Sequence, residues 1–180
     1  RSFYLYTALA GMLVSGFSPL GAVLPNTFFY LLSIPVFYFL ANRYFKNKNL
    51  ALVSAALYAL SPVTITHARF FWNPNLLIPL SVFFWYLATT PPQSRHLSLS
   101  FFLAGLLAAI MFNFHYFSLI PVFIYGLYLL AVKRSDEFSY LLLGFFLGSL
   151  PLLVFELKNH FYLTNAFFYN LNHGIRGLAH

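Results

Sequence analysis

The sequence contains no cysteine and only three acidic residues among 180, and charged residues of either sign make up 7% of it. The absence of cysteine excludes a disulfide framework and a thiolate metal site. The sequence also lacks G-x-x-x-x-G-K-[ST], G-x-G-x-x-G, H-E-x-x-H and G-x-S-x-G, so it gives no support for a nucleotide-hydrolysing pump. Its ten Lys and Arg are spread over short segments without a clustered basic face, and nucleic acid is not an expected partner.

Apolar residues dominate the chain instead. Hydrophobic residues make up 61% of it and aromatic residues 22%, with a mean hydropathy of +0.76, values typical of membrane proteins. Several charge-free runs approach the ~20 residues that cross a bilayer as a helix. We therefore predict an all-α fold, a polytopic transmembrane helical bundle forming one domain over residues 1–180, with about six or seven membrane helices. The expected spans lie near 25–42, 50–66, 76–90, 97–112, 116–132 and 138–155.

Both ends of the chain differ from its middle. The stretch "FSPLG" (17–21), followed by Pro25, interrupts the first apolar run, because proline ends or kinks a helix. Residues 1–20 are therefore expected to form a surface helix or a partly inserted one. The chain does not begin with methionine and shows no signal-peptide pattern, and "YNLNHGIRGLAH" (169–180) reads as part of a polar loop. We expect an internal fragment of a longer protein, in which residues 156–180 begin an outer loop.

The distribution of positive charge predicts an orientation in the membrane. Three short segments, "RYFKNK" (43–48), "SRH" (94–96) and "KRSDE" (133–137), together hold six Lys and Arg. Along the chain they alternate with segments that hold three Lys and Arg in all, namely Arg69, Lys158 and Arg176. By the positive-inside bias the first set is cytoplasmic, so "HARFFWNPN" (67–75) is predicted to face outward.

Small residues recur at helical spacing in "GLLAA" (105–109) and "GFFLG" (144–148). In lipid, helices associate by close packing, and such patterns are typical of helix contact surfaces. We expect these two segments to pack closely against neighbouring helices.

The stretch "HARFFWNPN" gathers four polar side chains between two apolar spans. They are His67, Arg69, Asn73 and Asn75. In one interpretation this is a connecting turn, in which Asn73 or Asn75 caps the next helix and Arg69 extends to lipid headgroups. In the other, Arg69 binds a phosphate or diphosphate, for which its planar, always charged guanidinium is well suited. His67 precedes Arg69 by two residues, so on a helix the two side chains point apart.

Two further polar clusters lie at the ends of expected spans. Asn113 and His115 fit hydrogen-bonded packing residues better than a ligand or a base. Glu156, Lys158 and His160 fall at the outer end of the last span, and Glu156 is the only acid expected on that side. At positions i and i+4, Glu156 and His160 could share a helical face and hold a proton or a metal ion. Two ligands are a weak metal signal, however, and an ordinary surface pair is the alternative.

With these elements in place, the chain resembles a known family. The elements are "RYF" (43–45), "ALVSAALYALSP" (51–62), "AR" (68–69), "WNPN" (72–75) and the later "FELKNHFYLTN" (155–165). In this order they resemble the multi-spanning glycosyltransferases of the protein O-mannosyltransferase type. This is the family 39 group of dolichyl-phosphate-mannose-protein mannosyltransferases, with its aminoarabinose-transferase relatives.

The resemblance implies a GT-C fold with an active site on the outer face of a bacterial or archaeal plasma membrane. It further implies a polyprenyl-phosphate-linked sugar donor, a lipid, glycan or protein acceptor, and no cofactor or metal. Arg69 and Lys158 would bind the donor phosphate. His67, Asn73, Asn75, Glu156 and His160 would shape the site. The catalytic carboxylate of such enzymes lies in the first large outer loop, expected upstream of Arg1, so residues 1–180 alone are expected to be inactive.

A non-enzymatic membrane protein is the alternative, either a lipid-glycan flippase or a small-solute transporter, with a purely structural subunit as a third possibility. Prolines fall within several expected spans and favour this interpretation. They are Pro35, Pro62, Pro79, Pro121 and Pro151. A transporter should carry ionisable or broken-helix elements near the bilayer midplane, whereas the charged residues here gather at the ends of the spans.

Overall fold

The computed structural model of the protein describes residues 2–166, 168 and 169. These residues form helices joined by turns, and no strand occurs among them, which confirms the all-α prediction. They fall into two compact units, unit 1 (residues 1–148) and unit 2 (residues 149–180). The organisation of the whole chain as one transmembrane domain stays a prediction.

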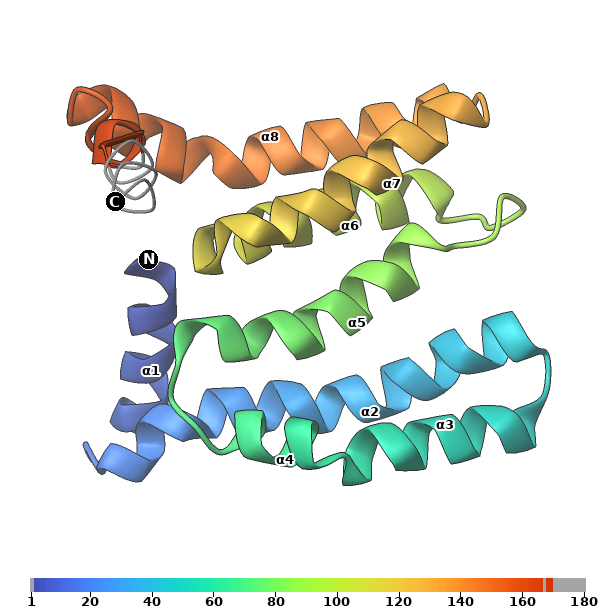
Figure 1. Ribbon diagram of the computed structural model, residues 1–180, viewed down its shortest axis with the longest axis horizontal. Helices are drawn as coiled ribbons and strands as arrows, with labels where there is room; N and C mark the ends of the chain where they lie inside the picture. The colour runs from blue at the N-terminus through green and yellow to red at the C-terminus, as the bar shows by residue number, and fades with distance from the viewer. Residues whose placement is uncertain (1, 167, 170–180) are drawn as a thin grey trace, which may run out of the picture. The chain divides into compact units, whose positions relative to one another are not determined.

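The helices follow one another with few intervening residues (Figure 1). In chain order they are α1 (Ser2–Val14), the 3₁₀ turn η1 (Pro19–Val23), α2 (Leu24–Phe45), α3 (Lys48–Leu60), α4 (Pro62–Ala68), η2 (Asn73–Leu76), α5 (Leu77–Ala88), α6 (Leu97–Phe114), η3 (Tyr116–Ser118), α7 (Leu119–Ala131) and α8 (Ser135–Lys158). Figure 1 shows α2, α3, α5, α6 and α7 running roughly alongside one another in unit 1, with α1 across their direction.

The predicted break after the first apolar segment is confirmed. Gly16 and Phe17 both have positive φ, 65° and 63°, and reverse the chain direction after α1. Beyond this turn, α1 and η1 pack so closely that a Cβ on Gly11 would lie 2.1 Å from the carbonyl oxygen of Gly21. Helix α1 is thus a separate element packed at the start of α2, while its depth in a membrane stays a prediction.

The prolines affect the helices unequally. Pro35 and Pro151 lie inside the continuous helices α2 and α8, so these two spans are not interrupted. Pro62 begins α4 after Ser61, and α3 and α4 meet there at a bend of 51°. Among the five prolines named above, Pro62 is thus the one at which a bent helix pair forms, and a broken span of this kind is what the transporter interpretation requires.

The number of helices that can cross a membrane is lower than expected. Among the described residues, three are long and apolar enough, Pro19–Phe45, Leu97–Phe114 and Ser135–Lys158, and the bent α3–α4 pair raises the number to four at most. The expected spans near 76–90 and 116–132 are instead shorter apolar helices, Pro74–Ala88 and Tyr116–Ala131. Even with the 3₁₀ turn at its start included, each helix is shorter than the ~20 residues that cross a bilayer, and a charge-free run in the sequence does not show where the helix within it ends.

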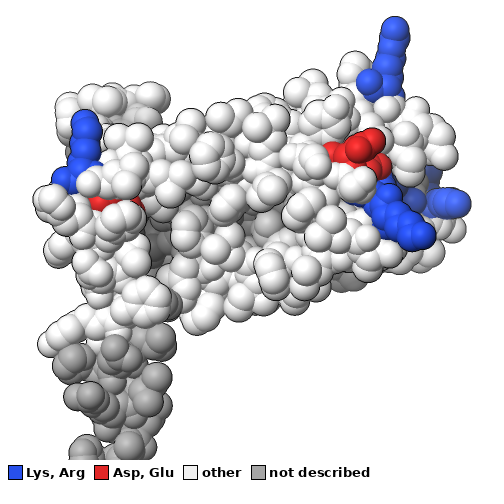
Figure 2. Space-filling view, turned by 90° about the horizontal axis from the view of Figure 1, so that it is seen from above, with Lys and Arg blue, Asp and Glu red and all other residues white. Residues whose placement is uncertain are grey.

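The three basic segments form tight helix connections at one end of unit 1 (Figure 1). Lys46 ends α2 in the left-handed region, and the Asn47 side chain accepts hydrogen bonds from Asn49 N and Leu50 N at the start of α3. Arg43 donates to the Tyr86 carbonyl at 2.6 Å, at the end of α5. In the face of unit 1 seen in Figure 2, charged side chains gather at this end, and the surface along the helices is uncharged.

Small residues produce the closest helix contact in unit 1. A Cβ on Gly105 would lie 2.1 Å from the Leu141 carbonyl oxygen, and one on Gly144 would lie 2.0 Å from that of Phe102. The backbones of α6 and α8 therefore touch, as their small-residue patterns predicted. The core beside this contact is apolar and includes Phe84, Phe101, Ala104, Ala108, Leu129 and Leu141.

Candidate functional site

The loop between α4 and α5 lies at the end of unit 1 opposite the basic segments (Figure 1). Residues 69–72 have no regular secondary structure, because α4 ends at Ala68 and the 3₁₀ turn η2 begins at Asn73. Two backbone hydrogen bonds mark its ends, from Arg69 N to Thr66 O at 3.3 Å and from Asn75 N to Trp72 O at 3.0 Å. The conformation between them depends on contacts with other elements.

Those contacts come from polar side chains on the first turns of α2. Asn26 Nδ2 donates to the Phe70 carbonyl at 3.0 Å, and Thr27 Oγ1 donates to the Ala68 carbonyl at 3.0 Å. The two carbonyls lie immediately before and after Arg69. Asn26 is only 1% exposed, so its amide is committed to this contact. Helix α2 thus fixes the backbone on both sides of the arginine.

The arginine itself extends from this fixed backbone. Arg69 is exposed, and its guanidinium makes no hydrogen bond or ion pair with another residue that the structure describes. Arg69 also closes α4 as its C-terminal capping residue, so its position is set by a helix end as well as by α2. The result is an unpaired cation with five donors on an anchored loop.

His67 lies beside the arginine but is engaged with its own helix. Its Nδ1 lies 2.8 Å from the Val63 carbonyl, and since a carbonyl can only accept, Nδ1 is the donor. His67 also lines a cleft of about 180 Å³ together with Thr66, Phe70, Trp72 and Asn75. His67 thus bonds its own helix, whereas the Arg69 guanidinium has no partner among the described residues. This agrees with the expectation that the two side chains point apart.

Asn75 is a buried part of the loop rather than a helix cap. It is 0% exposed, and its Nδ2 donates to the Phe70 carbonyl at 2.6 Å. Helix α5 begins at Leu77 without a side-chain cap, so the interpretation of Asn75 as its cap is wrong. Asn73 is the first residue of η2, and its role as a cap stays a prediction.

A second feature of Asn75 is its side-chain oxygen. Asn75 Oδ1 is buried and has no hydrogen-bond partner. Buried acceptors without partners are rare, and each one calls for an explanation such as a water or a ligand. This oxygen belongs to a residue that lines the cleft beside Arg69. Helix α1 adjoins the same loop, because the rings of Tyr4 and Phe71 stack at 4.6 Å.

The other predicted site residues lie in unit 2. Glu156 is 7% exposed, and its carboxylate accepts hydrogen bonds from Leu163 N at 3.0 Å, Thr164 N at 2.9 Å and Thr164 Oγ1 at 2.6 Å. Its oxygens thus hold the turn that follows α8. Lys158 is exposed as the last residue of α8, and its ammonium has no partner among the described residues.

Glu156 and His160 do not share a helical face. Helix α8 ends at Lys158, and His160 has a positive φ of 51°, a conformation that leaves the helix. The i and i+4 pairing is therefore wrong, because the helix ends between the two residues. Within residues 2–166, 168 and 169, no three His, Asp or Glu side chains gather as metal ligands would. Arg176, which the orientation argument also counted, lies outside the described residues.

The two acids of unit 1 lie at the opposite end of that unit from Arg69 (Figure 1). Asp136 and Glu137 are in the first turn of α8, at the basic end of unit 1, and Glu137 pairs with Arg134 at 2.9 Å. Glu156 is occupied by the turn at residues 163–164. The described chain therefore supplies a cation for an anionic group but no carboxylate poised beside that cation in unit 1.

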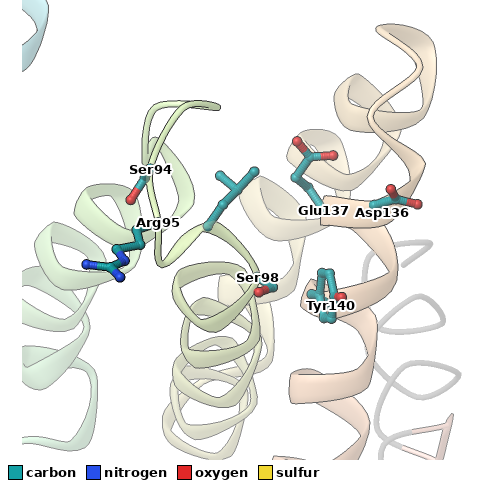
Figure 3. A pocket seen from close by; sticks show the side chains of 7 residues that line it. Ser94, Arg95, Ser98, Asp136, Glu137 and Tyr140 are labelled. Carbon is teal, nitrogen blue, oxygen red and sulfur yellow. The ribbon is translucent and has the colours of Figure 1, made fainter.

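A larger cleft of about 270 Å³ lies at the basic end, between the α5–α6 segment and the start of α8 (Figure 3). Its lining includes Arg95, Asp136, Glu137 and Tyr140. Figure 3 shows the Arg95 side chain directed away from the two carboxylates, and no ion pair joins them. Because these groups do not converge, the Arg69 loop is the better candidate site.

Sequence reasoning missed the residues that hold the loop. Asn26, Thr27 and Tyr30 lie in "LPNTFFY" (24–30), which reads as the start of an apolar span. One signal was present: three side chains able to donate hydrogen bonds occur within five residues, and positions 26 and 30 fall on one helical face. Their partners are 41 to 45 residues away, and nothing in the local pattern identifies them. His115 Nδ1 accepts a hydrogen bond from Phe117 N at the start of η3, which agrees with the hydrogen-bonded role expected of this residue.

Comparison with known proteins gives one match. A family model described as dolichyl-phosphate-mannose-protein mannosyltransferase matches residues 3–155, which include all of unit 1 apart from its first two residues. No curated protein and no solved structure matches the chain.

Proposed function

Because the chain belongs to the dolichyl-phosphate-mannose-protein mannosyltransferase family, we propose that it takes part in sugar transfer from a polyprenyl-phosphate-linked donor. The acceptor is a hydroxyl-bearing lipid, glycan or protein. The acceptor oxygen attacks the anomeric carbon, the bond from that carbon to the phosphate oxygen breaks, and polyprenyl phosphate leaves with the electron pair. The proton of the acceptor passes to a carboxylate base.

The unpaired guanidinium of Arg69 carries this proposal. An exposed arginine on a fixed backbone can meet a phosphate with two parallel N–H donors, an arrangement that a lysine cannot reproduce. The leaving phosphate gains charge as the glycosidic bond breaks, so a cation held in place stabilises the transition state more than the ground state. Arg69 lies at the end of the helices, where the phosphate of a membrane-embedded lipid would be found.

The remaining residues receive supporting roles in this proposal. Lys158, unpaired at the end of α8, is a second ligand for the donor phosphate. His67, Asn73 and Asn75 shape the pocket around Arg69, and Glu156 with His160 shapes the outer segment after α8. Asn75 Oδ1, a buried acceptor without a partner, suits a hydroxyl group of the sugar or a bound water.

The base is proposed to come from outside residues 1–180. Two of the three acids lie at the basic end of unit 1, and the third is occupied by three hydrogen bonds. A general base must reach the acceptor proton directly or through one water. We place it in an outer loop of the full-length protein, on the same outward side of a plasma membrane as Arg69.

Binding of dolichyl phosphate to the purified full-length protein tests the role of Arg69 independently of the sugar. Charge-assisted hydrogen bonds contribute about 1.5–3 kcal/mol, so Arg69→Ala should raise the Kd about 10-fold to 150-fold. Arg69→Lys should recover only part of this loss. The matched control is Arg95→Ala, which removes an exposed arginine at the other end of unit 1 and should leave the Kd unchanged.

Dolichol, which has the same chain without the phosphate, separates the phosphate contact from the lipid contact. Its binding should not change in Arg69→Ala. Equal dolichyl phosphate affinity in wild type and Arg69→Ala would overturn the assigned role.

A further inference from the structure

The backbone on both sides of Arg69 is held by two adjacent residues of α2. Thr27 bonds the carbonyl of Ala68, and Asn26 bonds the carbonyl of Phe70, each at 3.0 Å. We infer that Asn26 and Thr27 are positioning residues that orient the Arg69 guanidinium for the donor phosphate. This inference rests on the proposed function of Arg69, because neither residue is assigned a contact with substrate.

The local structure leaves this task to α2. Apart from the bond from Arg69 N to Thr66 O, residues 69–72 have no regular hydrogen bonding of their own, so the peptide planes beyond Arg69 depend on contacts with other elements. The bond to the Ala68 carbonyl orients the 68–69 peptide plane, and the bond to the Phe70 carbonyl orients the 70–71 plane. Together they limit the backbone torsions between these planes, which are φ and ψ of Arg69 and Phe70. Preorganisation of this kind lowers the entropy lost when the arginine binds its ligand.

The chemistry of α2 at this point supports a dedicated role. An asparagine side chain that is 1% exposed costs free energy to bury and is tolerated because its amide is satisfied. Here that amide bonds the backbone next to Arg69, and Asn75 donates to the same Phe70 carbonyl at 2.6 Å. An apolar side chain at position 26 could also pack in a membrane helix, but it would remove the link from α2 to the Phe70 carbonyl and leave that carbonyl bonded from within the loop, by Asn75.

Thr27 allows an isosteric test in the full-length protein. Thr27→Val removes the hydroxyl and keeps the shape, whereas Thr27→Ser keeps the hydroxyl. We expect Thr27→Val to raise the Kd for dolichyl phosphate about fivefold to tenfold, as the loss of one positioning hydrogen bond implies. Thr27→Ser should stay within about twofold of wild type. Asn26→Leu, which keeps the branched shape and the number of side-chain heavy atoms, should act as Thr27→Val does, and it replaces that variant if Thr27→Val fails to fold.

A double-mutant cycle separates positioning from general stability. If Thr27 acts through Arg69, Thr27→Val should change the Kd by less than about twofold once Arg69→Ala is present, because interacting residues are non-additive. A variant that lowers Tm but leaves the Kd of the folded protein unchanged would assign Thr27 a structural role only and overturn the inference.

Arg69→Ala distinguishes the two possible failures. If Arg69→Ala leaves dolichyl phosphate binding unchanged, the proposed function of Arg69 fails, and the inference fails with it. If Arg69→Ala weakens binding but Thr27→Val and Asn26→Leu do not, only the positioning inference fails.

Discussion

The hydroxyl of Tyr30 donates a hydrogen bond of 2.9 Å to the main-chain carbonyl of Asn75, across 45 residues of sequence. Tyr30 is 2% exposed and Asn75 is 0% exposed, so the contact is shielded from solvent and lipid. It joins the second turn of α2 to the 3₁₀ turn that leads into α5. Together with Asn26 and Thr27, one face of α2 therefore holds the loop at both its beginning and its end.

Tyr30→Phe should destabilise the protein by about 1–3 kcal/mol, because the Asn75 carbonyl would remain buried without a partner. The free energy of unfolding in detergent, measured by heat or denaturant, checks this value. Tyr6→Phe is the matched control, since Tyr6 is 66% exposed and the same atom is removed. Equal losses in the two variants would contradict a specific role for the Tyr30 hydroxyl.

Part of this arrangement follows from the sequence and part does not. Hydropathy identified an all-α membrane protein, and "FSPLG" (17–21), followed by Pro25, marked the first break. Hydropathy overestimated the number of spans, because an apolar run does not show where the helix within it ends, as in Pro74–Ala88. Pro35 was expected to interrupt a span, but it lies inside the continuous helix α2. A proline within a long helix can thus be accommodated without ending the helix.

The candidate site, too, could be predicted from the sequence only in part. The identity of Arg69 and its location in a polar connecting segment are local properties, and the sequence predicts them. The side chains that hold it belong to α2, and tertiary packing alone brings residues 26 and 70 together. Asn75 illustrates the difficulty, because an asparagine before a helix usually caps it, whereas here burial against Phe70 determines its hydrogen bond.

Gly144→Ala should disrupt the contact between α6 and α8. The added Cβ would lie 2.0 Å from the Phe102 carbonyl oxygen, a backbone atom that cannot move without shifting α6. We expect a loss of about 1–3 kcal/mol or more from overpacking, measured as a lower Tm in detergent. Gly126→Ala is the control, because its Cβ would meet two ring atoms of Phe138, at 3.2 and 3.6 Å, and no backbone atom, and helix propensity favours alanine. A similar Tm in both variants would contradict the close α6–α8 contact.

Arg43→Ala should destabilise the basic end of unit 1. Arg43 Nη1 donates to the Tyr86 carbonyl at 2.6 Å and to Thr89 Oγ1 at 3.1 Å, and its guanidinium lies 4.5 Å from the centre of the Tyr86 ring. Loss of these contacts should cost about 1.5–3 kcal/mol in unfolding free energy. Arg95→Ala removes the same charge from the same end, so it controls for effects on membrane insertion. An equal effect of both substitutions would show that charge alone, not the contact with α5, is responsible.

Glu156→Gln should loosen the turn after α8 rather than abolish a chemical step. A carboxylate accepts at both oxygens, whereas the glutamine NH₂ group would face one of the donors at residues 163–164. Amide hydrogen exchange at Leu163 and Thr164 should become about tenfold faster, a change typical of the loss of one or two hydrogen bonds. Thr164→Val, which removes only the hydroxyl donor, should have a smaller effect. Unchanged exchange together with complete loss of sugar transfer would indicate that Glu156 is a catalytic group.

Single cysteines should report the orientation of unit 1, because residues 1–180 contain no cysteine of their own. Trp72→Cys lies in the Arg69 loop, where the tryptophan is 53% exposed, and Gln93→Cys lies in the exposed α5–α6 segment. In intact cells carrying the full-length protein without other cysteines, a membrane-impermeant maleimide should label only the cysteine at position 72. The cysteine at position 93 should react only after permeabilisation, because the positive-inside bias assigns its end to the cytoplasm. The reverse pattern would put Arg69 on the cytoplasmic face, where an outward-facing donor phosphate cannot reach it.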